Sequence, residues 1–330
     1  MSFFAILFAL LIEQVRPLAP HNPIHSFSRG YARWASRNFD AGGRHHGWLA
    51  WTVAVLLPSL LAVGIHWALA LLLGWPVAVL WSICVLYFTL GFRQFSHHFT
   101  DIRDALDAGD EERARELLAG WQRVDASELP RSEIVRHVIE YSVLAAHRHV
   151  FGVLTCFSVL AAFGLGPAGA VLYRMSEFVS RHWHLRSLDD TQPASAALQG
   201  AAIRAWHLID WLPARTTALA FAVVGSFEDA IDCWRNHAQR FPHDNDGVVL
   251  AATSGAVNVR LGGAVLKSIV QPGTSPSQEP PVEVAQESIE STPGRQPEVA
   301  HLAQIVGLVW RSVVLWMVLL ALLTLARLLG

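Results

Sequence analysis

Residues 305–329 read IVGLVWRSVVLWMVLLALLTLARLL, and this stretch decides the fold class. A helix needs roughly 20 predominantly apolar residues to cross the hydrocarbon core of a bilayer, and this run exceeds that length. Its two charged residues, Arg311 and Arg327, lie toward the two ends, where long side chains reach the membrane surface. The run therefore predicts a transmembrane helix.

Four more apolar runs support the same class: residues 2–15, 49–73, 77–90 and 150–173. Gly74-Trp75-Pro76 separates the second run from the third, which predicts a tight helical hairpin. Glycines and a proline at 164–169 interrupt the fourth run, so we expect a kink or a re-entrant turn there. The sequence thus predicts an all-α, polytopic integral membrane protein with four to five membrane-embedded helical segments and additional cytoplasmic helices.

Composition argues against several other classes. The 330 residues are 52% hydrophobic and only 16% charged, whereas soluble domains carry about 25% charged residues. The net charge of −2 argues against electrostatic binding to nucleic acid. Three cysteines without a CxxC pair predict neither a disulfide framework nor a zinc site.

The arginines predict the orientation in the membrane. The segment between the first two apolar runs contains Arg16, Arg29, Arg33, Arg37 and Arg44. Positively charged loops stay in the cytoplasm, and a hairpin over 49–90 returns the chain to the same side, so residues 92–149 are expected there too. The run at 2–15 lacks the basic start and cleavage site of a signal peptide, which favours a retained anchor. We therefore expect a multi-pass protein of the bacterial inner (cytoplasmic) membrane.

The chain divides into three parts. Residues 1–270 form the helical membrane domain, and residues 301–330 form the C-terminal transmembrane helix. Between them, residues 271–300 are rich in Pro, Ser and Glu, which predicts a disordered linker. Within the first part, Asp110 is expected to cap a helix over 111–120, and Ser132 a helix that starts at Glu133.

Two polar patterns leave their chemistry open. Glu133, His137, Glu140 and His147 fall on one face of the predicted helix, which is compatible with metal ligation or with a polar stripe of i,i+3 and i,i+4 pairs. GLGPAG at 164–169 matches the dinucleotide-binding pattern only formally, because no strand precedes it and it contains a proline. The identity of any metal site therefore stays unassigned.

The stretch HLIDWLPAR at 207–215 places a carboxylate and a guanidinium beside an apolar run. Such charges are costly there unless they are paired or reach water. We expect Asp210 and Arg215 to pair with each other, or to bridge to a neighbouring helix, near a cytoplasmic pocket.

Several stretches, read together and in order, resemble motifs of the CobD/CbiB family of cobalamin-biosynthesis membrane proteins. They are HNPI (21–24), ALDAGDEERARELL (105–118), RSEIVRHVIE (131–140), GPAGAVLYR (166–174), DWLPAR (210–215) and NDGVVLAATSGAVNVRLGG (245–263). The sequence departs from the family at several acidic positions. Trp206 and His207 stand where the family has a pair of aspartates before the DWLPAR motif.

The resemblance implies an ATP-driven, and therefore Mg²⁺-dependent, ligase that attaches aminopropanol or its phosphate to adenosylcobyric acid through an amide bond. It implies Glu140 and Asp125 as the catalytic acids. The residues implied for binding substrate or anions are Arg123, Asp210, Arg215, Asn245, Gly247 and Arg260. The departures leave one alternative open, because AmpE-like proteins, which also lack the paired aspartates, resemble this chain too. They are non-catalytic inner-membrane proteins linked to cell-wall sensing and β-lactamase regulation.

Overall fold

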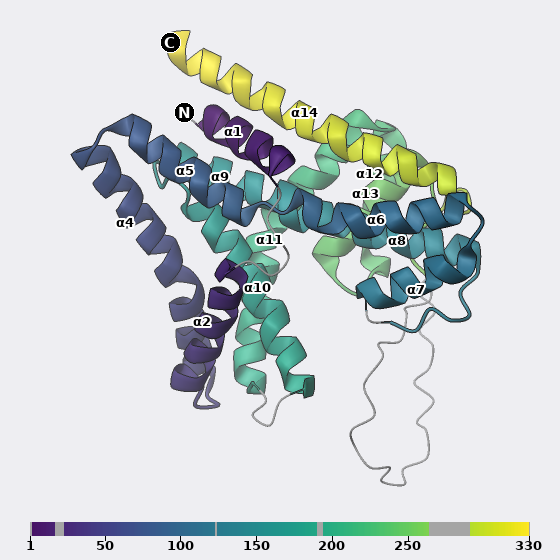
Figure 1. Ribbon diagram of the computed structural model, residues 1–330, viewed down its shortest axis with the longest axis horizontal. Coiled ribbons are helices and arrows are strands. Elements are labelled where there is room, and N and C mark those ends of the chain that lie inside the picture. The colour runs from purple at the N-terminus through teal and green to yellow at the C-terminus, as the bar shows by residue number, and fades with distance from the viewer. Residues whose placement is uncertain (1, 17–22, 123, 190–193, 264–290, 330) are drawn as a thin grey trace. The chain divides into compact units, whose positions relative to one another are not determined.

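The computed structural model describes residues 2–16, 23–122, 124–189, 194–263 and 291–329, and these residues are almost entirely helical. The α-helices are α1 (Ser2–Val15), α2 (Pro23–Phe39), α3 (Arg44–Trp51), α4 (Leu57–Leu72), α5 (Trp75–Thr89), α6 (Phe92–Asp107), α7 (Glu111–Gln122), α8 (Arg131–Ala146), α9 (Gly152–Ala162), α10 (Ala168–Asp189), α11 (Ala196–Val224), α12 (Phe227–His237), α13 (Asp244–Val257) and α14 (Val299–Leu329) (Figure 1). Two π-turns, Thr52–Leu56 and His147–Phe151, join α3 to α4 and α8 to α9, and a 3-10 turn over Ala238–Arg240 follows α12. The described residues contain no β-sheet, which confirms the predicted all-α class.

The chain forms two compact units. The first comprises Met1–Gln94, Ala145–Thr217 and Val313–Gly330, and the second comprises Phe95–Leu144 and Ala218–Ser312. Each is described by itself below.

Two helical hairpins dominate the first unit. Helices α4 and α5 pack against each other, and Gly74, at a φ of 91°, makes the reversal between them that Gly74-Trp75-Pro76 predicts (Figure 1). Helices α9 and α10 form the second hairpin, whose turn places Gly164 and Gly166 at positive φ. The helices of this hairpin approach so closely that a Cβ on Gly169 would overlap the backbone carbonyl of Cys156. The break predicted within 150–173 is therefore a complete helix reversal.

Helix α13 forms the centre of the second unit. Every residue from Asn245 to Ala256 is buried, although many of them are small or polar. A Cβ on Gly255 would collide with the backbone of Asp229 in α12, so small residues let these helices touch. Helix α7 starts as predicted, because Asp110 Oδ1 accepts the Arg113 N–H at 2.9 Å. The predicted cap at Ser132 is wrong, because α8 already begins at Arg131 and the carbonyl of Pro130 accepts the N–H groups of Glu133 and Ile134.

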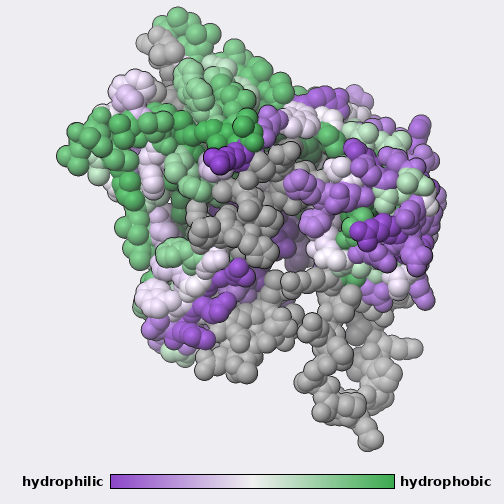
Figure 2. Space-filling view, in the orientation of Figure 1, coloured by the Kyte–Doolittle hydropathy of each residue, from purple (hydrophilic) through white to green (hydrophobic). Residues whose placement is uncertain are grey.

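Several helices have the length and composition of membrane spans. In the described part of the chain, three continuous helical stretches qualify: Arg44–Leu72, Arg131–Ala162 and Val299–Ala326. Phe3–Val15 and Trp75–Thr89 are shorter apolar helices. Large apolar side chains gather on the surface over α4 and α5, where Leu71 and Leu72 are 79% and 81% exposed (Figure 2). Such a surface is stable in lipid, so the chain is an all-α membrane protein.

Two predicted boundaries differ from the structure. The span expected to start at residue 150 belongs to a longer helical stretch that begins at Arg131 and passes through a π-turn. Of the predicted linker 271–300, residues 271–290 lie outside the described residues, but Thr292 and Arg295 are hydrogen bonded to residues 258–261, directly after α13. That last part is therefore attached to the second unit.

Candidate functional site

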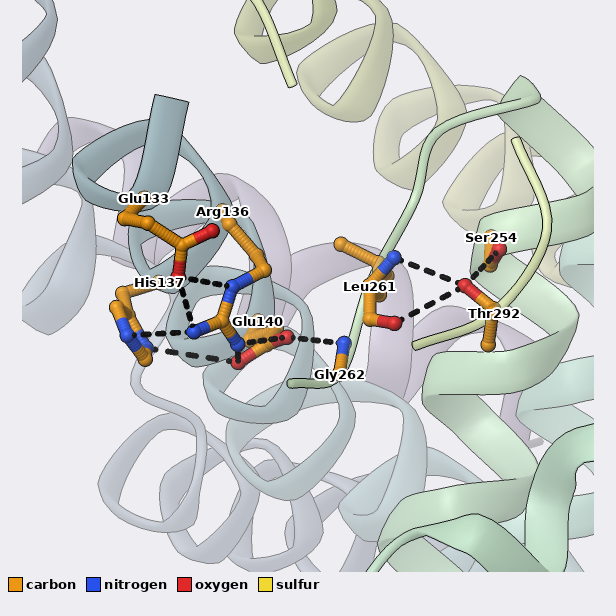
Figure 3. A network of polar contacts seen from close by, with 8 residues as sticks. All are labelled: Glu133, Arg136, His137, Glu140, Ser254, Leu261, Gly262 and Thr292. Carbon is orange, nitrogen blue, oxygen red and sulfur yellow. Dashed lines mark hydrogen bonds and ion pairs between the residues drawn. The ribbon is translucent and has the colours of Figure 1, made fainter. Parts of the chain in front are cut away.

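A charged network lies on α8 in the second unit and centres on Arg136, which is 3% exposed (Figure 3). Its Nη2 and Nε donate to Glu133 Oε2 at 2.6 and 2.9 Å, and its Nη1 donates to Glu140 Oε1 at 3.0 Å. The helix brings these groups together because residues at i,i+3 and i,i+4 lie on one face. The guanidinium thus holds two carboxylates in fixed positions.

Glu140 also binds a loop that is distant in sequence. The backbone N–H of Gly262 donates to Glu140 Oε1 at 2.7 Å, and His137 Nδ1 lies 3.6 Å from Glu140 Oε2 (Figure 3). The loop follows α13, which ends at Asn258 in the left-handed conformation (φ 53°), and Gly262 itself has a φ of 81°. A backbone donor and a guanidinium therefore orient the same carboxylate.

Thr292 and Arg295, which follow residues 264–290 in the chain, hold that loop in place through hydrogen bonds. Thr292 Oγ1 accepts the backbone N–H of Leu261 at 2.8 Å and the hydroxyl of Ser254 at 2.7 Å (Figure 3). The N–H of Arg260 donates to the carbonyl of Arg295 at 2.8 Å. These bonds fix the backbone that presents the Gly262 N–H to Glu140.

The electrostatics of this network favour a cationic ligand. Glu133 and Glu140 carry two negative charges and Arg136 one positive charge. Glu133 is the accessible member, with 35% of its side chain exposed, whereas the Glu140 side chain is 13% exposed. Among the described residues, no group of three His, Cys, Asp or Glu side chains is placed to hold a metal ion. The network can therefore bind an ammonium group more readily than it can chelate a metal by itself.

A second buried polar cluster lies in the first unit and contains Asp210, which is fully buried. Asp210 Oδ1 accepts the Tyr173 hydroxyl at 2.8 Å and lies 3.0 Å from His147 Nε2. His147 Nδ1 lies 2.9 Å from the Thr217 hydroxyl, which itself donates to the Pro213 carbonyl at 2.8 Å. His147 thus joins Asp210 to Thr217 through buried contacts of its two ring nitrogens.

The expected pairing of Asp210 with Arg215 is wrong. The two residues are not i,i+3 or i,i+4 neighbours, so α11 turns them to different sides. Arg215 instead lies over the Trp211 ring, 4.2 Å from its centroid, and donates to the Trp211 carbonyl at 2.9 Å. The expected bridge from Asp210 to other helices is present, since His147 and Tyr173 lie outside α11.

The other predicted site residues have different environments. Asp125 is exposed and accepts the backbone N–H and hydroxyl of Ser127, hydrogen bonds that lower the pKa of its carboxyl group. Arg260 is exposed, whereas Asn245 is buried in the first turn of α13. Gly247 lets α13 approach the carbonyl of Ala238, which indicates a packing role. Arg123 lies outside the described residues.

These residues fall into two groups. The second unit contains Glu140, Asp125, Asn245, Gly247 and Arg260, whereas the first unit contains Asp210 and Arg215. Sequence reasoning missed Arg136, although its spacing from Glu133 and Glu140 is the signal of a helical charge network. It also missed the Gly262 N–H, which leaves no side-chain signal at all.

Comparisons with known proteins agree with one another. The family model described as CobD/Cbib protein matches residues 2–292. The Cobalamin biosynthesis protein CobD of Stutzerimonas stutzeri (strain A1501) is 31% identical over 329 residues, covering 96% of each chain. Its namesake in Chromobacterium violaceum is 34% identical over 64% of this chain and 63% of its own length. The namesake in Mycobacterium tuberculosis (strain ATCC 25618 / H37Rv) is 28% identical over 73% and 74%. No solved structure matches the chain significantly.

Proposed function

Because the chain belongs to the CobD/CbiB family of cobalamin-biosynthesis proteins, we propose that it forms the amide bond between adenosylcobyric acid and aminopropanol or its phosphate. The observation that carries this proposal is the Glu140 carboxylate, oriented at once by Arg136 and by the Gly262 N–H. We further propose that it works as a multi-pass protein of the inner membrane.

Amide formation requires an amine that has lost its ammonium proton. The amine nitrogen bonds to the carboxyl carbon, the bond from that carbon to the leaving oxygen breaks, and the nitrogen gives up its extra protons. A carboxylate beside the amine first binds the ammonium group and then accepts a proton from it. Glu140 is suited to this role because its position is fixed, and Glu133 supplies the second negative charge.

ATP would supply the energy that turns the carboxyl oxygen into a leaving group. Mg²⁺ in such sites is usually held by one or two protein carboxylates together with the phosphates. Within the network, Glu133 is the residue able to take that position, because Glu133 Oε1 has no partner among the described residues and the side chain is partly exposed. Arg260 and Asp125, both exposed in the same unit, are further candidates for contacting the substrates.

Complementation tests the proposal directly. The chain is expressed in a strain that lacks its own CobD/CbiB enzyme and is grown with cobyric acid as the corrin source. We expect growth with the natural sequence and loss of growth with Glu140→Gln, because the amide keeps the shape but cannot accept the proton. Glu116→Gln is the matched control, since Glu116 is 63% exposed and pairs with Arg113 on the same unit.

The alternatives give distinct results. Absence of growth with the natural sequence at verified expression and membrane insertion would refute the ligase. An unchanged corrinoid content after deletion of the gene, together with altered β-lactamase induction, would point to the AmpE-like function instead.

A further inference from the structure

Helix α10 carries a charged triplet that the proposed reaction does not use. Glu177, whose side chain is only 6% exposed, lies between Arg174 and Arg181. Arg174 Nη1 donates to Glu177 Oε2 at 3.1 Å, and Arg181 Nη1 donates to Oε1 at 3.0 Å. The carboxylate thus holds two guanidinium groups on one face of the helix.

Most donors of these two guanidiniums are unused. Each arginine spends one nitrogen on Glu177, and in the described part of the chain neither Arg174 nor Arg181 has another protein partner. Their Nε and Nη2 groups therefore remain available as donors. The two side chains differ in solvent exposure, which is 23% for Arg174 and 57% for Arg181.

The π-turn His147–Phe151 places further polar groups beside this triplet. Arg148 and His149 lie close enough to Glu177 to act on the pKa of its carboxyl group. His149 Nδ1 is buried and has no hydrogen-bond partner among the described residues. A π-turn is a rare irregularity that is frequently found at functional sites. The turn here faces a helix whose arginine donors are not satisfied.

The net charge of the triplet stays positive over the whole physiological pH range. Burial raises the pKa of Glu177, but the guanidiniums of Arg174 and Arg181 outweigh burial and hold it at about 2. Glu177 therefore stays ionised and neutralises one of the two guanidiniums it binds, which leaves one positive charge in excess. An excess positive charge on one helix face favours the binding of an anion.

We propose that Arg174 and Arg181, spaced by Glu177 and joined by His149 from the neighbouring turn, form a binding site for a phosphate group. Two guanidinium groups with free N–H donors match the geometry of tetrahedral phosphate oxygens. The imidazole Nδ1 supplies one further hydrogen-bonding group. Either a free phosphate compound or a phospholipid headgroup brings this chemistry, and the site is independent of the proposed ligation.

Binding measurements with the purified full-length protein test the site. In a phosphate-free maltoside detergent, inorganic phosphate and pyrophosphate are titrated by calorimetry, and the thermal midpoint is followed in parallel. In a second arm, the protein is placed in nanodiscs of phosphatidylcholine with or without phosphatidic acid. We expect Arg181→Gln to weaken binding at least tenfold. Arg204→Gln, an exposed arginine of the same unit, should bind like the natural protein.

Each outcome has a distinct meaning. Saturable phosphate binding that depends on Arg174 and Arg181 supports the site with a free anion as ligand. Dependence on both arginines only in the phosphatidic acid nanodiscs supports the site with a lipid headgroup as ligand. Absence of binding in both arms, or binding unchanged in Arg181→Gln, overturns the proposal. The decision rests on Arg181→Gln because its exposed side chain lets the variant fold, and neither arm requires a corrinoid or ATP.

Discussion

Removing one partner of the buried His147–Asp210 pair should destabilise the first unit strongly. In Asp210→Ala, His147 Nε2 and the Tyr173 hydroxyl both lose their acceptor while they remain buried. An unsatisfied buried polar group costs about 1–3 kcal/mol, so two such groups predict a loss of roughly 2–6 kcal/mol. Asp210→Asn should be milder, because an amide oxygen in the place of Oδ1 still accepts from the Tyr173 hydroxyl and from His147 Nε2. Its expected cost is about 1–2 kcal/mol, the difference between a charge-assisted and a neutral hydrogen bond.

Reversible unfolding in mixed micelles of dodecyl maltoside and sodium dodecyl sulfate measures these free energies. The decisive quantity is the coupling between the two positions in a double-mutant cycle. Because His147→Leu and Asp210→Leu each strand the other partner, the double variant should lose at least 2 kcal/mol less than the sum of the single variants. Additive losses, or an Asp210→Ala variant within about 0.5 kcal/mol of the natural protein, would refute the energetic coupling of His147 and Asp210.

Three further predictions address other parts of the molecule. Gly169→Ala should lower the unfolding free energy by at least 2 kcal/mol in the same micelle assay, because the new Cβ overlaps a backbone carbonyl of α9. Gly307→Ala, with open space around it, should stabilise α14 by up to about 1 kcal/mol. The pKa of Glu177 is held below its ordinary value, so the ionised carboxylate should add roughly 3 kcal/mol to the free energy of unfolding. This contribution should be complete above pH 4.5 and vanish as the pH falls through about 2. Unfolding free energies measured between pH 5 and pH 2 should therefore fall less steeply for Glu177→Gln. Thr292→Val removes the acceptor of the Leu261 N–H, and hydrogen exchange at residues 258–263 should accelerate about tenfold, with no change at α10.

The fold class could be predicted from the sequence because membrane spans leave long apolar runs. The α4–α5 hairpin was predictable too, since Gly74 supplies a positive φ and Pro76 cannot extend the preceding helix. Helix boundaries were harder to predict from the sequence. The start of α8 depends on a backbone carbonyl at Pro130, which competes with the side-chain cap that Ser132 suggested.

The candidate site could be predicted only where it depends on local spacing. Glu133, Arg136 and Glu140 fall on one helix face whatever the rest of the chain does. Partners that are far apart in sequence were not predictable, as with the Gly262 N–H on Glu140 and Tyr173 on Asp210. The error over Asp210 and Arg215 has the same origin. Proximity in sequence suggested an ion pair, but in the folded chain Asp210 contacts His147 and Tyr173 instead.

The clamp formed by Thr292 and Arg295 sets a limit on how the protein can be shortened for biochemical work. The apolar α14 is an obvious segment to delete when a better-behaved version is sought, and a cut anywhere before residue 291 would remove it. Such a cut would also remove the groups that hold the loop carrying the Gly262 N–H. The match to the family model ends at residue 292, three residues short of Arg295. A truncated protein designed on that match alone would retain every charged residue of the α8 network and lose part of the support that positions Glu140.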